Sequence, residues 1–139
     1  MTYKKILIPI DGKKPSEEIV DFICSTQGVT GLEITVIYVI EVPRSLPLHA
    51  EMPEKVEYAR LAIDVANKIA EKYGAAISTS IIYSRAAEDS ILMTAEDLKV
   101  DVIAIAQDNQ KLRIFSNMAS SVYQRAKCSV WLFNSKTIV

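Results

Sequence analysis

Histidine and cysteine are scarce in this sequence. Among 139 residues there are one histidine, His49, and two cysteines, Cys24 and Cys128. These are too few for a zinc cluster. His49 is the one histidine that a Ser-His-Asp triad could use, and it lies in a proline-rich stretch that we expect at the surface. Each cysteine lies inside an apolar periodic segment, so we expect two buried, reduced thiols. We therefore expect no catalytic residues, no metal site and no enzyme activity.

The sequence also lacks an excess of charge of one sign and lacks long apolar runs. It has 16 Lys and Arg against 17 Asp and Glu, a formal net charge of −1, and so no basic surplus that would indicate a nucleic-acid partner. Its apolar stretches reach only about six to eight residues, whereas a membrane helix needs roughly 20. The N-terminus enters the apolar run Ile6–Ile10 without the features of a signal peptide. We expect a cytoplasmic protein with neither nucleic acid nor membrane as partner.

What the sequence does contain is a regular alternation of strand and helix patterns. No linker, repeat or low-complexity segment interrupts it, so we expect a single domain over residues 1–139. Apolar runs predict strands at 5–10, 32–42, 76–83, 101–106 and 128–133. The central runs are apolar on both faces, whereas serine and threonine dilute 76–83, as suits an edge strand. This order predicts an α/β fold, an open parallel sheet with helices on both faces.

Helical periodicity fills the intervals between these strands. The helices are predicted from about Pro15 to a point before Gly28, and over 54–73, 86–99 and 116–126. Gly74 is the expected stop of the second helix. The same periodicity places Tyr73 and Leu98 on the inward faces of their helices.

Ligands of such sheets bind beyond the carboxyl ends of the strands, which directs attention to the segments that follow them. Asp11, after the first strand, is either an acceptor for a nucleotide's base or ribose or a turn aspartate, because Asp-Gly is a common turn pair. The segment 107–115, after the fourth strand, contains no glycine. A phosphate-binding loop there would need glycines for backbone amides to approach the phosphates. The residues alone therefore do not support a bound triphosphate.

Four segments, taken in order, resemble the universal stress protein family. They are Ile6 to Gly12, Val36 to Pro43, Asp101 to Ala106, and Val122 to Val130. The resemblance implies a five-stranded parallel sheet in the order 3-2-1-4-5, of the adenine nucleotide α-hydrolase-like type. It also implies a homodimer, often paired through the fifth strand. That fits an apolar edge strand, which is a liability if uncovered; its residues here are Val130, Trp131, Leu132 and Phe133.

The family's phosphate loop is altered in this chain. ATP-binding members carry Gly-x-x-Gly, nine residues, then Gly-Ser or Gly-Thr, whereas only six residues, 110–115, separate the matching positions here. All three glycines are replaced, and Asn117 takes the hydroxyl position. By resemblance, Asp11 and Val39 match the residues that meet the adenosine part. The candidate nucleotide pocket is thus Asp11, Val39, Ala106, Asn109, Ser116 and Asn117.

Three hypotheses follow from this pattern. The first is a non-catalytic, dimeric regulatory or protective module of the stress-protein type, with weak or absent ATP binding and no required cofactor. The second is a nucleotide-binding member that takes ATP or AMP through a modified loop; Asn109 can still adopt a left-handed turn. The third is a different adenine-nucleotide α-hydrolase-like enzyme, which would need a glycine-rich loop that the sequence lacks.

Overall fold

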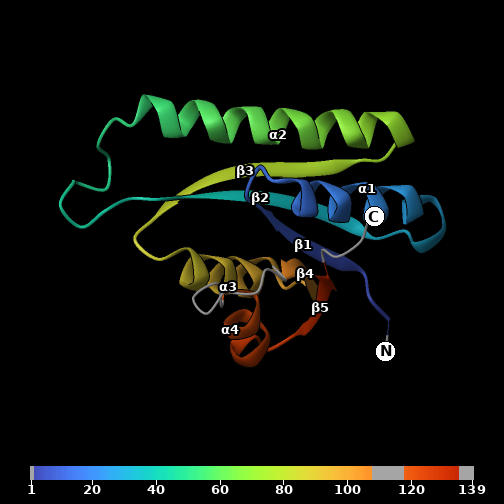
Figure 1. Cartoon of the computed structure of the whole chain (residues 1–139). Coiled ribbons are helices and arrows are strands. Elements are labelled where there is room, and N and C mark those ends of the chain that lie inside the picture. The colour runs from blue at the N-terminus through green and yellow to red at the C-terminus, as the bar shows by residue number, and fades with distance from the viewer. Residues whose placement is uncertain (1, 108–117, 135–139) are drawn as a thin grey trace.

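The computed structural model describes residues 2–107 and 118–134, in which strands and helices alternate (Figure 1). The strands form one sheet in the order β3-β2-β1-β4-β5, with every neighbouring pair parallel. The predicted α/β class, strand order and edge position of the third strand are confirmed. The elements are β1 (Lys5–Ile10), α1 (Lys14–Thr30), β2 (Glu33–Glu41), α2 (Pro53–Tyr73), β3 (Ile77–Ser84), α3 (Ala87–Leu98), β4 (Val102–Gln107), α4 (Met118–Arg125) and β5 (Ser129–Asn134).

Helices cover both faces of the sheet. Figure 1 shows α1 and α2 on one side and α3 and α4 on the other. The side chains of β1 alternate between the two cores, with Ile6 and Ile8 packed toward α1 and α2 and Leu7 packed toward α3 and α4. All three are fully buried. This two-sided burial explains why the strand reads as a continuous apolar run rather than an alternating one.

Asp101, just before β4, fixes the start of β1. Its Oδ2 accepts the backbone N–H groups of Lys4 and Lys5 at 2.7 and 2.8 Å. These bonds hold the pKa of the Asp101 carboxyl below its usual value. The carboxylate therefore joins β1 to β4, the pair between which the strand order reverses.

The end of α1 differs from the prediction. The helix does not end before Gly28 but continues to Thr30, and Gly31 terminates it in the left-handed conformation at φ 69°. Its N–H bonds to the Gln27 carbonyl at 2.8 Å. Gly74 closes α2 in the same way, at φ 65°, as predicted. The remaining predicted bounds agree with the observed ones to within one residue, except the start of the fourth helix, predicted at 116, which lies outside the described residues.

Several side chains predicted to lie on the inward faces of the elements are not buried, among them Phe22 and Met118, which are 53% and 38% exposed. Tyr73 and Leu98 are each 40% exposed, and Cys128 is half-buried. Tyr73 turns its hydroxyl outward to donate to Asp21 Oδ1 at 2.6 Å. Leu98 is the last residue of α3, where the chain leaves the helix through the left-handed Lys99. Cys24 is buried as expected, and burial raises the pKa of its thiol to about 11; both cysteines are free.

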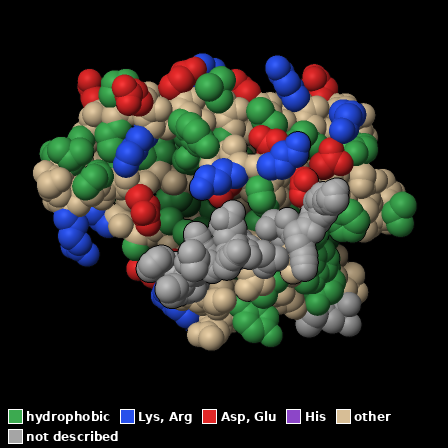
Figure 2. Space-filling model, viewed as in Figure 1, with side chains coloured by type: hydrophobic (Ala, Val, Ile, Leu, Met, Phe, Trp, Pro, Cys, Tyr) green, Lys and Arg blue, Asp and Glu red, His purple; other side chains and the backbone are tan. Residues whose placement is uncertain are grey.

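Charge is mixed over the surface. Figure 2 shows acidic and basic side chains interspersed among apolar ones on the described part of this face, which therefore presents no field of one sign. Within residues 2–107 and 118–134, no helix is both long and apolar enough to cross a membrane.

The two glycines near the end of α1 should respond in opposite ways to alanine. Gly28→Ala should raise the free energy of unfolding by about 0.5–1 kcal/mol, since the residue is helical and an added Cβ meets nothing within 4 Å. Gly31→Ala should lower it by about 1 kcal/mol, since its φ is positive. Urea denaturation measures both, and a loss of stability in Gly28→Ala would contradict the observed helix end.

Candidate functional site

A pocket of about 390 Å³ lies at the carboxyl ends of β1, β2 and β4. This is the place where ligands bind in open parallel sheets, next to the reversal of strand order between β1 and β4. Its volume lies at the lower end of the range for small-molecule sites, about 300–1,000 Å³. Its lining residues are Pro9, Ile10, Asp11, Lys13, Ser16, Tyr38, Val39, Ala87, Ile91, Ile105, Ala106, Met118 and Ala119.

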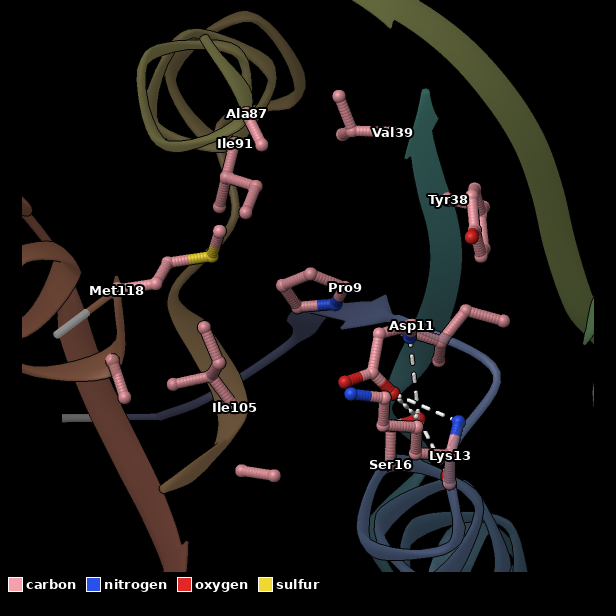
Figure 3. A pocket seen from close by; sticks show the side chains of 13 residues that line it. Pro9, Asp11, Lys13, Ser16, Tyr38, Val39, Ala87, Ile91, Ile105 and Met118 are labelled. Atoms are coloured by element: carbon pink, nitrogen blue, oxygen red, sulfur yellow. Dashed lines mark hydrogen bonds between the residues drawn. The ribbon is translucent and has the colours of Figure 1, made fainter. Parts of the chain in front are cut away.

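One wall of the pocket is apolar. Val39 of β2, Ile91 of α3, Ile105 of β4 and Met118 of α4 approach it from four different elements (Figure 3). None of these side chains can transfer a proton or act as a nucleophile. Such a wall excludes water and offers contact to a flat, apolar part of a ligand.

Asp11 forms the polar corner opposite that wall. Its Oδ1 accepts the backbone N–H of Lys13 at 2.9 Å and the Ser16 hydroxyl at 3.0 Å (Figure 3). The first bond is an Asx turn, which shapes the connection into α1. Asp11 Oδ2 has no hydrogen-bond partner within the part of the chain that the structure describes. The residue is therefore a turn aspartate that still presents one carboxylate oxygen for a ligand.

Ser16 holds Asp11 in this orientation. It is 3% exposed, and its Oγ accepts the Asp11 N–H at 3.3 Å while lying 3.0 Å from the Lys13 carbonyl oxygen. A buried hydroxyl needs such partners to offset its desolvation. The Asp11 carboxylate is thus oriented by a second side chain from the first turn of α1.

A polar cluster joins the helices that carry the apolar wall. The Glu88 carboxylate of α3 accepts hydrogen bonds from Ser121 and Arg125 of α4, and Arg125 also pairs with Asp89 at 2.9 Å. These acidic partners raise the pKa of the Arg125 guanidinium. The cluster fixes α4, and with it Met118, against α3.

The structure brings Asp11, Val39 and Ala106 together in this pocket, as they were grouped from the sequence. Asn109, Ser116 and Asn117 lie outside the described residues. Sequence reasoning missed Ser16, Tyr38 and Met118. Of these, only Ser16 leaves a signal, a small polar residue in the first helical turn after a turn aspartate. Across the described ranges, no group of three or more His, Cys, Asp or Glu side chains is arranged to hold a metal ion.

The sheet order and the site at its carboxyl edge define the adenine nucleotide α-hydrolase-like fold. The model of the universal stress protein family matches residues 2–134, and the chain belongs to this family. Comparison with curated proteins gives no match.

Solved structures of similar fold include universal stress proteins. One from Archaeoglobus fulgidus has a TM-score of 0.76 at 21% identity, over 95% of this chain and 94% of that one. Another from the same organism, in complex with dAMP, has a TM-score of 0.74 at 19% identity, over 95% and 98%. A universal stress protein in complex with cAMP has a TM-score of 0.74 at 17% identity, over 96% and 98%.

Ser16→Ala should lower the free energy of unfolding by about 1–2 kcal/mol, because it removes the buried hydroxyl that bonds to the Asp11 N–H and carboxylate and to the Lys13 carbonyl. Ser25→Ala is the matched control in the same helix. Ser25 is exposed, and its hydroxyl also donates to a backbone carbonyl, that of Phe22; its loss should cost less than about 0.5 kcal/mol. Equal losses in the two variants, measured by urea denaturation, would contradict the role given to Ser16.

Proposed function

We propose that this chain is a non-catalytic regulatory module of the universal stress protein type whose pocket takes an adenine nucleoside or nucleoside monophosphate. The observation that carries the proposal is the pocket of about 390 Å³ that joins the free carboxylate oxygen of Asp11 to an apolar wall. A carboxylate can accept from a ribose hydroxyl or an amino group, and the wall suits a base. The family members in complex with dAMP and cAMP support this choice of ligand.

Triphosphate is the weaker ligand in this proposal. The segment 107–115 contains no glycine, so few backbone amides can approach a phosphate chain as they do in glycine-rich loops. Recognition then rests on the nucleoside side of the pocket, at Asp11, Val39 and Ala106. We propose the nucleotide as a ligand and not as a substrate; the charged side chains of the described pocket lining are Asp11, whose Oδ1 is held in the turn, and Lys13. A cytoplasmic location remains part of this proposal.

Calorimetric titration with AMP and ATP, each with magnesium, tests the ligand. We expect AMP to bind and ATP to bind no more tightly than AMP, with no phosphate release. Asp11→Asn should raise the Kd for AMP by about tenfold or more, the value of a hydrogen bond to a charged group. Asp64→Asn is the control, since Asp64 pairs with Arg60 on the exposed face of α2. A micromolar Kd for ATP well below that for AMP would contradict the proposal.

We further propose that the chain forms a homodimer through β5. Among the strands that the structure describes, β5 pairs with β4 alone and lies at the edge of the sheet. Trp131 and Phe133 pack within the chain, in edge contacts with Tyr3 at 5.4 Å and Phe22 at 5.9 Å. Leu132, 37% exposed, is left facing solvent. An apolar edge of this kind is normally covered.

Leu132→Lys should therefore convert the dimer to a monomer in light scattering at micromolar concentration, because it places a charge on the edge strand. It is a better test than Trp131→Lys, which would also break the contact with Tyr3. Met93→Lys, at a residue of α3 that is 64% exposed, is the control and should leave the mass unchanged. A wild-type monomer under these conditions would refute the proposal.

A further inference from the structure

A second hollow lies beside the pocket of Figure 3, between the end of β2 and the start of α2. It has a volume of about 420 Å³ and is lined by Asp11, Lys13, Tyr38, Val39, Ile40, Glu41, Glu54, Lys55 and Tyr58. Asp11, Lys13, Tyr38 and Val39 also line the first pocket. The two hollows therefore meet at the carboxyl ends of β1 and β2, and each alone is large enough for a small ligand.

The hollows lie on opposite faces of the sheet. Tyr38 and Val39 are neighbours in β2, and successive strand residues point to opposite faces; Figure 3 shows them on either side of the β2 ribbon. Val39 packs with the core under α3 and α4, and Tyr38 with the core under α1 and α2. A ligand seated against Ile91 and Met118 in the first hollow therefore reaches Tyr58 in the second by passing over the end of the sheet, past Asp11 and Lys13.

The second hollow offers aromatic faces. The rings of Tyr38 and Tyr58 lie 6.2 Å apart between centroids, at 56°. Tyr58 is 48% exposed and reaches over Gly12, where a Cβ would come within 2.6 Å of its Cε1. Neither tyrosine hydroxyl has a hydrogen-bond partner within residues 2–107 and 118–134. Because residue 12 is glycine, the Tyr58 ring can lie close to the backbone beside the second hollow.

Two lysines, Lys13 and Lys55, line the second hollow together with the carboxylates of Asp11, Glu41 and Glu54. Lys13 lines both hollows and has no carboxylate within ion-pair distance among the described residues. Lys55 Nζ donates to the Glu41 carbonyl oxygen at 3.2 Å, which holds it at the rim. The Glu41 carboxylate is engaged elsewhere, accepting the Ala87 N–H at 2.8 Å. A single phosphate crossing here would meet an unpaired ammonium group.

We propose that the two hollows form one site for a dinucleotide. One adenine nucleoside lies against Val39 and Asp11, the linking phosphate passes Lys13, and the second base stacks on Tyr58. This inference rests on the proposed function and extends it by naming a ligand with two bases and one bridging phosphate. Stacking of a base on an aromatic side chain supplies the added affinity.

Calorimetric titration with AMP and with the linear dinucleotide adenylyl-(3′→5′)-adenosine tests this inference. We expect the dinucleotide to bind the wild-type chain about tenfold more tightly than AMP, in line with one base–aromatic stack. Tyr58→Ala should abolish this advantage and leave the Kd for AMP within about twofold, whereas Tyr58→Phe should keep it because the ring remains. Leu61→Ala, 52% exposed in the same helix and absent from both linings, is the matched control.

The outcomes separate this inference from the proposed function. If AMP binds and the dinucleotide binds no more tightly, the second hollow is not a base site and only this inference fails. If neither ligand binds, the proposed function fails as well. Equal losses in Tyr58→Ala and Leu61→Ala would also overturn the inference, since the effect would then belong to the helix and not to the ring. Thermal unfolding of each variant shows that it is folded during the titration.

Discussion

The position of β1 in the middle of the sheet is the constraint on which the rest of the structure depends. β1 pairs in parallel with β2 on one side and β4 on the other. From β1 the chain adds β2 and β3 on one side of the sheet and then crosses back to add β4 and β5 on the other side. Because parallel crossovers are right-handed, this path places the two helix pairs on opposite faces. As a result, α1 leaves the carboxyl end of β1 on one face of the sheet and α4 follows β4 on the other face. The space between these two strand ends is where the pocket lies. Fully buried Ile6, Leu7 and Ile8 hold β1 in that place.

The turn after β1 has a structural role and, under the proposed function, also a role in ligand recognition. The two interpretations of Asp11 from the sequence, a turn aspartate or a ligand acceptor, are compatible because a carboxylate has two oxygens. Oδ1 closes the Asx turn and bonds to Ser16, so the side chain is fixed without a ligand. An oxygen that is already oriented costs less conformational entropy when a ligand binds to it. The Asx turn at Asp11, a local contact, therefore orients the carboxylate oxygen that remains for a ligand.

The fold could be predicted from the sequence to a greater extent than the site. Alternating strand and helix patterns predict the class, and two-sided burial identifies the central strands, because both depend on local sequence. The end of α1 was predicted wrongly, before Gly28, since only the observed positive φ of Gly31 shows where the helix stops. Tyr58 lies over Gly12 through the packing of α2, a contact between distant segments that no local pattern indicates. Ser16 becomes recognisable only once Asp11 is seen beside it.

The absence of glycine from segment 107–115 bears on which part of a ligand would supply affinity under the proposed function. In a glycine-rich loop, backbone N–H groups donate hydrogen bonds to each added phosphate, so affinity rises with the length of the phosphate chain. Here the two linings share Asp11 and Lys13; the first hollow is otherwise mainly apolar, and the second adds Tyr58 and the charged side chains of Glu41, Glu54 and Lys55. Under the proposed function, added phosphates would therefore gain little, whereas added flat apolar surface would gain contact with the walls of the two hollows. The proposal thus places recognition at the bases of the ligand and not at its phosphates.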